Sequence, residues 1–456
     1  MKRISIILRH RRAVRKSVTV MLLLIALAFM ASHQQPGRAA YTVNTQAVVT
    51  PPPTVPMLTG TFAAVNNGPS DQTNPHVDCN RVSYTNDDFQ GSSTIHYFDF
   101  STGMDNVIPG NGLDRLSDLS GTRIAFSELS PSLGVDQIVL FDTATQTRTV
   151  LSGPWCSNPA LGGNVIAFED RKSFFTNPGE IDVYDTSINW VNQLTNDALF
   201  DKGPAVSATG NTIVWEKCQT ASTGCDIYVG FQVSPGGFAT GLLTGAAGED
   251  HRPDTNDELV VYTSTRGGET DIYYQPLSNA PEVQIAIPGD QRDVRISGNL
   301  IVFESQTAAG YDVFVYDLSS GRLYQVTNTP GVDETLSDIS VCNGVGRIVY
   351  AVAGGFGDFD VYAFTFQVPS SVQPDVNDLI AVVNSFELPH GIKTSLVAKL
   401  KDALSGLANA DTATACDALT SFINECSAQS GKALTEEQAA QLINAATQVR
   451  TVLGCP

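Results

Sequence analysis

Between residues 57 and 368, apolar and polar side chains alternate with a period of two, which predicts β-strands. One unit recurs seven times: a short apolar run with an aromatic residue, a loop with glycine, and a second alternating strand. The first strands begin 41 to 47 residues apart, at "VSYT" (82–85), "IAFS" (124–127), "IAFE" (166–169), "IVWE" (213–216), "VVYT" (260–263), "IVFE" (301–304) and "IVYA" (348–351). A shorter strand candidate precedes each of them, and a fourth follows each second strand. A four-stranded unit of this length predicts one blade of a β-propeller.

Seven copies favour a seven-bladed ring, and six blades with one degenerate copy is the alternative. A spare strand-like stretch, "MLTGTFAAV" (57–65), precedes the first copy. The last copy ends at "FTFQV" (364–368) and has no outer strand of its own. Because rings commonly close when one terminus completes the last blade, we expect 57–65 to supply that strand.

After "VPSSVQP" (368–374) the apolar period changes to about 3.6, which predicts helices. One apolar stripe is formed by Leu396, Leu400, Leu404 and Leu407. Asp411 is placed to cap the following helix, and Thr435 with Gln438 has the spacing of a capping box. The expected fold is therefore an all-β propeller followed by a small bundle of four helices, the first near 375–386.

The propeller repeats resemble those of TolB-type proteins. The likeness lies in patterns such as "DKGPAVSATGNTIVWE…CDIYVG…GLLTG" and covers about residues 57–368. TolB-type repeats usually carry a Ser-Pro-Asp-Gly turn, which here is mostly Ser-Gly-Asn or Ser-Gly-Thr. TolB-type rings usually have six blades, whereas seven copies are counted here.

The C-terminal stretch resembles FIMAH-type helical modules, which occur at the C-termini of many exported bacterial proteins. The matching residues are Phe386, Leu388, Pro389, Gly391, Phe422, Ile423, Asn424, Gly431 and Lys432. This resemblance implies a disulfide between Cys416 and Cys455. Elsewhere, Cys218 and Cys225 flank the short loop "CQTASTGC" and are expected to clasp a hairpin. Cys79, Cys156, Cys342 and Cys426 cannot be paired from the sequence.

The first 40 residues have the pattern of a secretory signal: a basic start, the apolar run "VTVMLLLIALAFMA" (18–31), and small residues at Ala39 and Ala40. An uncleaved anchor is the alternative, although 14 apolar residues are short for a membrane-spanning helix, which needs about 20. We therefore expect a secreted or periplasmic protein, with no integral membrane segment after signal removal. The predicted organisation is a signal (1–40), a Thr/Pro-rich linker (41–56), the propeller (57–368), a second linker (369–374) and the helical module (375–456).

The chain is acidic, with 27 basic and 47 acidic residues. Removal of the first 40 residues takes away eight basic side chains and leaves a net charge of −28. Because such a surface repels phosphate backbones, nucleic-acid binding is not expected.

Acidic residues gather just before the inner-strand candidates: Asp114, Asp201, Asp250, Asp290, Asp333 and Glu334. In a propeller this position favours carboxylates around one mouth of the central channel. One hypothesis is a site for Ca²⁺ or another hard cation, since such ions need several oxygen ligands. The alternative is that each carboxylate accepts backbone N–H bonds in its own turn. No cofactor is expected to be required.

The sequence contains neither GxSxG nor HExxH, which argues against a propeller-fronted enzyme of the prolyl oligopeptidase type and against a zincin. Some TolB-like seven-bladed proteins resemble oligogalacturonate lyases, which use a His-rich metal site. His76 and His251, together with Asp250 and Arg252, are the candidates for such a site, and plain surface histidines are the alternative.

These observations predict a secreted, non-catalytic binding or scaffold propeller that engages a protein or polysaccharide partner through its blade loops. The alternative prediction is a carbohydrate-active enzyme, either a polysaccharide lyase or a hydrolase, with its site at the acidic mouth of the channel.

Overall fold

The computed structural model describes residues 55–456, apart from 172–177, 246, 279, 309, 354–357, 369–371, 387, 410, 454 and 456. The predicted signal (1–40) and nearly all of the first linker (41–56) lie outside the described residues. The described residues form two compact units, one of strands and one of helices.

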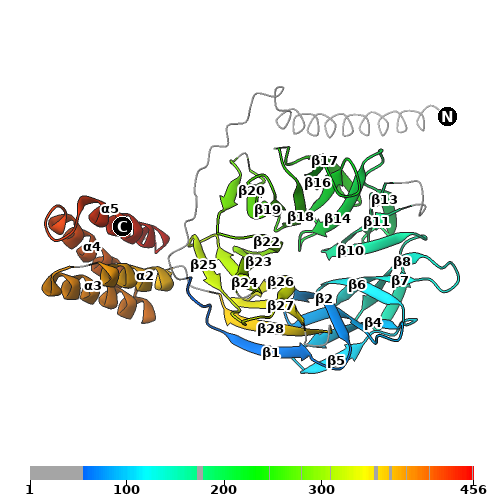
Figure 1. Cartoon of the computed structure of the whole chain (residues 1–456), viewed down its shortest axis with the longest axis horizontal. Helices are drawn as coiled ribbons and strands as arrows, with labels where there is room; N and C mark the ends of the chain where they lie inside the picture. Colours follow the sequence, from blue (N-terminus) through cyan, green and yellow to red (C-terminus); the bar gives the residue numbers. More distant parts are fainter. Residues whose placement is uncertain are drawn as a thin grey trace, which may run out of the picture. The chain divides into compact units, whose positions relative to one another are not determined.

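The strands form seven four-stranded sheets that surround a common centre, within the part of the chain described (Figure 1). Sequential strands run from the inside of each blade to its rim. Blades 1 to 3 consist of β2 (Asp71–Asp78), β3 (Arg81–Asp87), β4 (Ser93–Asp99) and β5 (Met104–Val107); β6 (Asp114–Ser120), β7 (Arg123–Leu129), β8 (Asp136–Asp142) and β9 (Thr147–Val150); β10 (Cys156–Gly162), β11 (Val165–Asp170), β12 (Glu180–Asp185) and β13 (Trp190–Gln193). Blades 4 to 6 consist of β14 (Phe200–Val206), β15 (Thr212–Cys218), β16 (Cys225–Ser234) and β17 (Gly237–Leu242); β18 (Asp250–Thr255), β19 (Leu259–Ser264), β20 (Asp271–Pro276) and β21 (Val283–Ile285); β22 (Gln291–Ser297), β23 (Leu300–Thr307), β24 (Gly310–Asp317) and β25 (Arg322–Gln325).

Blade 7 is built from both ends of the propeller sequence. Its inner three strands are β26 (Glu334–Cys342), β27 (Val345–Ala353) and β28 (Phe359–Gln367), and its outer strand is β1 (Thr61–Asn66). β1 pairs with β28 in antiparallel register, with Thr61 opposite Thr365. The prediction of seven blades, closed by the stretch 57–65, is confirmed.

The aromatic residue of each first-strand motif is buried in the body of its blade. These residues are Tyr84, Phe126, Phe168, Trp215, Tyr262, Phe303 and Tyr350, none more than 4% exposed. Burial of one such side chain contributes about 2–3 kcal/mol of transfer free energy. The repeated motif is therefore explained by packing within and between blades.

Every inner strand has a register shift in its pairing with the next strand of its blade. In six blades a residue at this shift has a left-handed backbone: Asn74, Leu116, Asn158, Gly203, Arg252 and Asp293, with φ between 52° and 59°. A bulge of this kind bends a strand and re-aims the side chains that follow it. It determines which residue of each blade faces the central channel.

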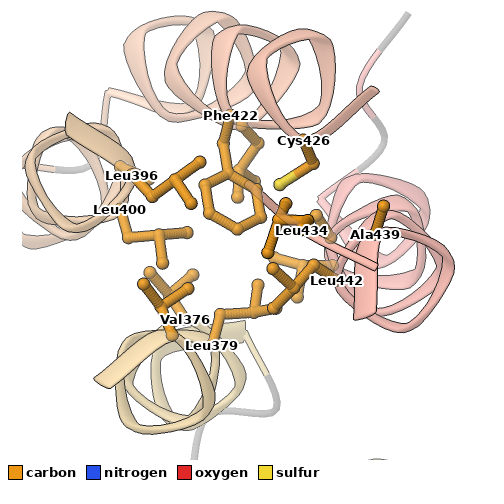
Figure 2. Close-up of a cluster of buried hydrophobic side chains, with 14 residues drawn as sticks. Val376, Leu379, Leu396, Leu400, Phe422, Cys426, Leu434, Ala439 and Leu442 are labelled. Atoms are coloured by element: carbon orange, nitrogen blue, oxygen red, sulfur yellow. The ribbon is translucent and has the colours of Figure 1, made fainter. Parts of the chain in front are cut away.

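The C-terminal unit has four helices among its described residues: α2 (Val372–Ser385), α3 (His390–Ala408), α4 (Thr412–Gln429) and α5 (Glu436–Val452). Figure 2 shows apolar side chains from all four converging on one core, with Leu396, Leu400 and Phe422 fully buried. Asp411 accepts a bond from the Thr414 backbone N–H, and Thr435 and Gln438 form the reciprocal bonds of a capping box.

The first helix begins at Val372, earlier than predicted and inside the stretch assigned to the linker 369–374. Pro374 is tolerated there because the N–H groups of a first helical turn have no intrahelical partner. None of the described helices is both long and apolar enough to cross a bilayer.

Three disulfides are formed. Cys218–Cys225 joins the neighbouring ends of β15 and β16, and Cys416–Cys455 lies in the helical unit; both pairs are those expected from the sequence. Cys79–Cys342 links blade 1 to blade 7 across 263 residues of sequence. Disulfides persist in oxidising compartments, so these three fit a secreted or periplasmic protein.

Candidate functional site

The inner strands bring one residue from each blade to the central channel at an equivalent register position. We call this set the channel ring: His76, Asp118, Ala160, Ala205, Asp254, Arg295 and Asp338. All seven line a cavity of about 570 Å³ to which all seven blades contribute. The charged members belong to blades 5, 6, 7, 1 and 2, whereas the two alanines make a small, uncharged arc in blades 3 and 4.

Each aspartate of the channel ring also joins its blade to the next. Asp118 Oδ2 accepts a bond from the Leu161 backbone N–H at 2.6 Å, Asp254 Oδ2 from Ile296 at 2.8 Å, and Asp338 Oδ2 from Val77 at 2.9 Å. One carboxylate oxygen is therefore engaged in structure.

His76 lies between two of these aspartates. Its Nδ1 is 3.7 Å from Asp118 Oδ1 and 3.5 Å from Asp338 Oδ2. Burial by itself lowers the pKa of His76, but the bond to Asp338 and the two negative charges outweigh it and raise the pKa above its ordinary value. For Asp338, burial is likewise outweighed by its bond to His76, so its pKa is lowered.

On the other side of the ring, burial raises the pKa of Asp254 to about 6, against the opposing positive charge of Arg295. The ring thus offers carboxylates for ammonium or guanidinium groups and one guanidinium for a carboxylate. Its volume falls within the range of small-ligand sites, about 300–1,000 Å³. This combination suits a short polar segment that carries both signs of charge.

The carboxylates predicted for the channel mouth lie elsewhere, and that placement is corrected by the structure. Asp114, Asp201, Asp250 and Glu334 all stand at the beginnings of inner strands and are at most 2% exposed. Because the chain enters each blade at this point, their side chains lie inside the blade and not on the channel. None of them lines the central cavity.

Two of these buried carboxylates have clear partners within their own blades. Asp201 Oδ1 accepts a 2.7 Å bond from the indole N–H of Trp215. Asp250 receives both of its bonds, at 2.9 and 3.1 Å, from the Arg266 guanidinium. These contacts support a structural role.

The remaining two candidates accept backbone bonds. Asp290 Oδ1 accepts from Thr270 N–H at 2.8 Å, and Asp333 Oδ1 accepts from Tyr311 N–H at 2.9 Å. No three of the six predicted carboxylates, all of them described, approach closely enough to share one cation. Binding of Ca²⁺ by any of them stays a prediction.

The predicted lyase residues are not brought together. His76 belongs to the channel ring, whereas His251 Nδ1 lies 3.0 Å from Glu216 Oε2 and does not line the cavity. The Arg252 guanidinium pairs with Asp293 of the next blade.

A second set of equivalent positions, which link neighbouring blades, was missed although the sequence motifs contained it. The fourth residue of a first-strand motif accepts a backbone N–H bond from the next blade's inner strand, in five blades: Thr85, Ser127, Glu169, Glu216 and Glu304. The glutamates of "IAFE", "IVWE" and "IVFE" were the visible signal. The sequence signal for the channel ring was weaker, because the residue type at its positions changes from blade to blade.

No protein-family model matches the sequence, and no curated protein matches it. Solved structures do show similar folds. The β-propeller domain of the trilobed protease from Pyrococcus furiosus is 11% identical with a TM-score of 0.52, over 66% of this chain and 98% of that one. The acylaminoacyl peptidase from Pyrococcus horikoshii is 12% identical with a TM-score of 0.50, over 66% of this chain and 52% of that one. TolB from Acinetobacter baumannii is 16% identical over 61% of this chain and 77% of that one, with a TM-score of 0.35.

These likenesses establish the propeller fold. This chain spans about half the length of the acylaminoacyl peptidase that it matches. The two propellers with TM-scores of 0.50 and 0.52 belong to peptidases, and not to scaffold proteins or carbohydrate-active enzymes. The predictions of a non-catalytic scaffold and of a polysaccharide lyase or hydrolase are therefore wrong. They rested on the absence of a catalytic motif from the sequence, and that absence says nothing about the kind of protein to which such a propeller belongs.

Proposed function

We propose that this chain is a peptidase-related propeller whose central channel receives a short peptide segment during peptide hydrolysis. The fold shared with peptidase propellers supports a role in peptide processing. The channel ring is the main support for peptide binding in the channel, because it places carboxylates and a guanidinium around one cavity.

A peptide suits this ring chemically. Its ammonium terminus, or a Lys or Arg side chain, would pair with the carboxylate of Asp254, Asp118 or Asp338. A peptide carboxylate would pair with Arg295. The alanines of blades 3 and 4 leave room for side chains on the uncharged arc.

The test is a binding titration with fluorescein-labelled unstructured decapeptides, using fluorescence anisotropy on the full chain. We expect saturable binding that weakens at least tenfold in an Asp254→Asn, Arg295→Gln variant. Asn at 254 still has an oxygen for the Ile296 N–H, so the link between blades 5 and 6 is kept. Asp402→Asn, on an exposed position of α3, removes a carboxylate outside the channel and should leave binding unchanged. Equal binding by all three proteins, or none by the wild type, would refute the proposal.

We also propose that the chain is exported by a cleaved N-terminal signal and that residues 375–456 are a FIMAH-type module. The basic and apolar start of the sequence and the three disulfides support export. The four-helix core and the Cys416–Cys455 pair support the module. Mass analysis of the mature N-terminus tests the first point, with a start near Tyr41 expected.

A further inference from the structure

The contact between blades 7 and 1, which we call the closing seam, is held differently from the other contacts between blades. In blades 1 to 6 the outer strand follows directly in sequence from the strand beside it. In blade 7 the outer strand is β1, which is joined to β28 by strand pairing and by side-chain contacts such as Phe62 on Phe364, and not by a connecting turn. The first four residues of β1 are exposed, and Val65 is its one buried side chain. If β1 detached from β28, blades 7 and 1 could separate without breaking the chain.

One covalent bond crosses the closing seam near the axis. Cys79 lies in the turn after β2, Cys342 ends β26, and their Cα atoms are 5.4 Å apart. The same turn is held by a 2.9 Å bond from Cys79 N–H to Ser340 Oγ. Arg347 of blade 7 lies over the Phe100 ring of blade 1, 4.0 Å from its centre, and bonds Asn80 at 3.1 Å.

This disulfide is the most accessible of the three that the described residues form. Cys218 and Cys225 are 0% and 1% exposed, and Cys416 is 6% exposed. Neither Cys79 nor Cys342 is buried. In the Cys416–Cys455 bridge only Cys455 is partly exposed, whereas Cys79 is exposed and Cys342 partly exposed, so a small dithiol reaches the closing seam most readily.

The disulfide also adjoins the central cavity. Asp78, the residue before Cys79, lines that cavity, as do Ser340 and Val341, which precede Cys342. Separation of these two turns would widen the channel at the end where the inner strands turn back.

We propose that Cys79–Cys342 is a redox-controlled latch that fixes the width of the channel. Reduction by a dithiol breaks the Sγ–Sγ bond; two electrons and two protons pass to the cysteines, and the reductant becomes its own disulfide. With the latch oxidised the ring is closed at both its inner and outer edges. With the latch reduced, β1, the polar contacts and one apolar cluster, which includes Val77 and Val82 of blade 1 and Val349 of blade 7, still hold the two blades together, but no covalent bond closes their inner edge, and the ring opens more often at this seam.

The test is hydrogen exchange of the folded full chain, followed by mass spectrometry, before and after mild dithiol treatment and alkylation of the released thiols. The fragments to follow contain Val77 and Cys79, whose N–H groups bond across the closing seam. The internal controls contain Leu161 and Ile296, which make the same kind of bond between blades without a disulfide. We expect exchange at least tenfold faster at the closing seam and changes within twofold at the controls.

A Cys79→Ser, Cys342→Ser variant should reproduce this pattern without reductant, and a matched Cys218→Ser, Cys225→Ser variant should not. If the first variant does not fold, dithiol reduction and alkylation of the folded wild type still provide the test. Unchanged exchange at Val77 and Cys79 after reduction would overturn the proposal. Equal acceleration at Leu161 and Ile296 would also overturn it, because that result describes general loosening.

Discussion

The buried carboxyl group of Asp114 makes the stability of the propeller depend on pH. Asp114 begins β6, is 0% exposed, and lies opposite Glu128 of β7. Burial, followed by the negative charge of Glu128, raises the pKa of Asp114 from 3.8 to about 7. The folded state therefore holds a proton that the unfolded chain releases near pH 4.

The direction and the size of the pH effect on stability follow from the difference between the pKa of Asp114 in the folded and in the unfolded chain. The stabilising effect is fully present below pH 3.8 and is lost as the pH rises through 7. A shift of roughly three pKa units, at about 1.4 kcal/mol each, corresponds to about 4 kcal/mol over the whole range. An Asp114→Asn variant is neutral at every pH and does not lose this contribution.

The assay is urea unfolding of wild type and Asp114→Asn at pH 5, 6, 7 and 8. The variant should gain stability relative to the wild type as the pH rises, by roughly 2–3 kcal/mol between pH 5 and pH 8. Other buried acids titrate in both proteins and cancel in the difference. Asp402→Asn should show no such trend. A difference that is flat across this range would refute the assignment of the raised pKa to Asp114.

Three further outcomes are expected. Glu304→Ala should lower the free energy of unfolding by roughly 3 kcal/mol, because it leaves the Ser337 N–H and Arg292 without their acceptor, and Glu304→Gln should cost less; urea titration measures both. Opening the disulfides Cys218–Cys225 and Cys416–Cys455, which span 7 and 39 residues, should cost about 2.4 and about 4 kcal/mol by loop-closure entropy, and a reversed order would contradict that account. Phe422→Ala should cost the helical unit about 3–5 kcal/mol, seen as faster hydrogen exchange in α4 with no change at β11.

The parts of the fold that could be predicted are those encoded by neighbouring residues. The alternation of "IVF"-type strands, the capping box of Thr435 with Gln438, and the Cys218–Cys225 hairpin all depend on short spacings. Ring closure could be predicted because the spare strand and the missing one were both visible. The start of α2 was placed too late because Pro374 was taken as a linker residue.

The channel ring could not be predicted, for a geometric reason. In six blades the residue that faces the channel follows a bulge with a left-handed residue, and Leu116 or Arg252 gives no sequence sign of that backbone. The acidic residues were visible, but their distance from the channel was not. The Cys79–Cys342 pairing was equally hidden, because only ring closure brings together residues 263 apart.

Pairing of β1 with β28 has a consequence for the order of folding. The strand that completes the last blade is synthesised first, and its partner follows about 300 residues later. Contacts this distant in sequence form slowly, so the propeller cannot complete its sheets until Phe359–Gln367 is available. Until then blade 7 lacks β28, so that β27 and β1 both present unpaired edges, which are templates for aggregation. A chain truncated before Phe359 should therefore aggregate. The helical unit has contacts between residues close in sequence, so it can fold independently of ring closure.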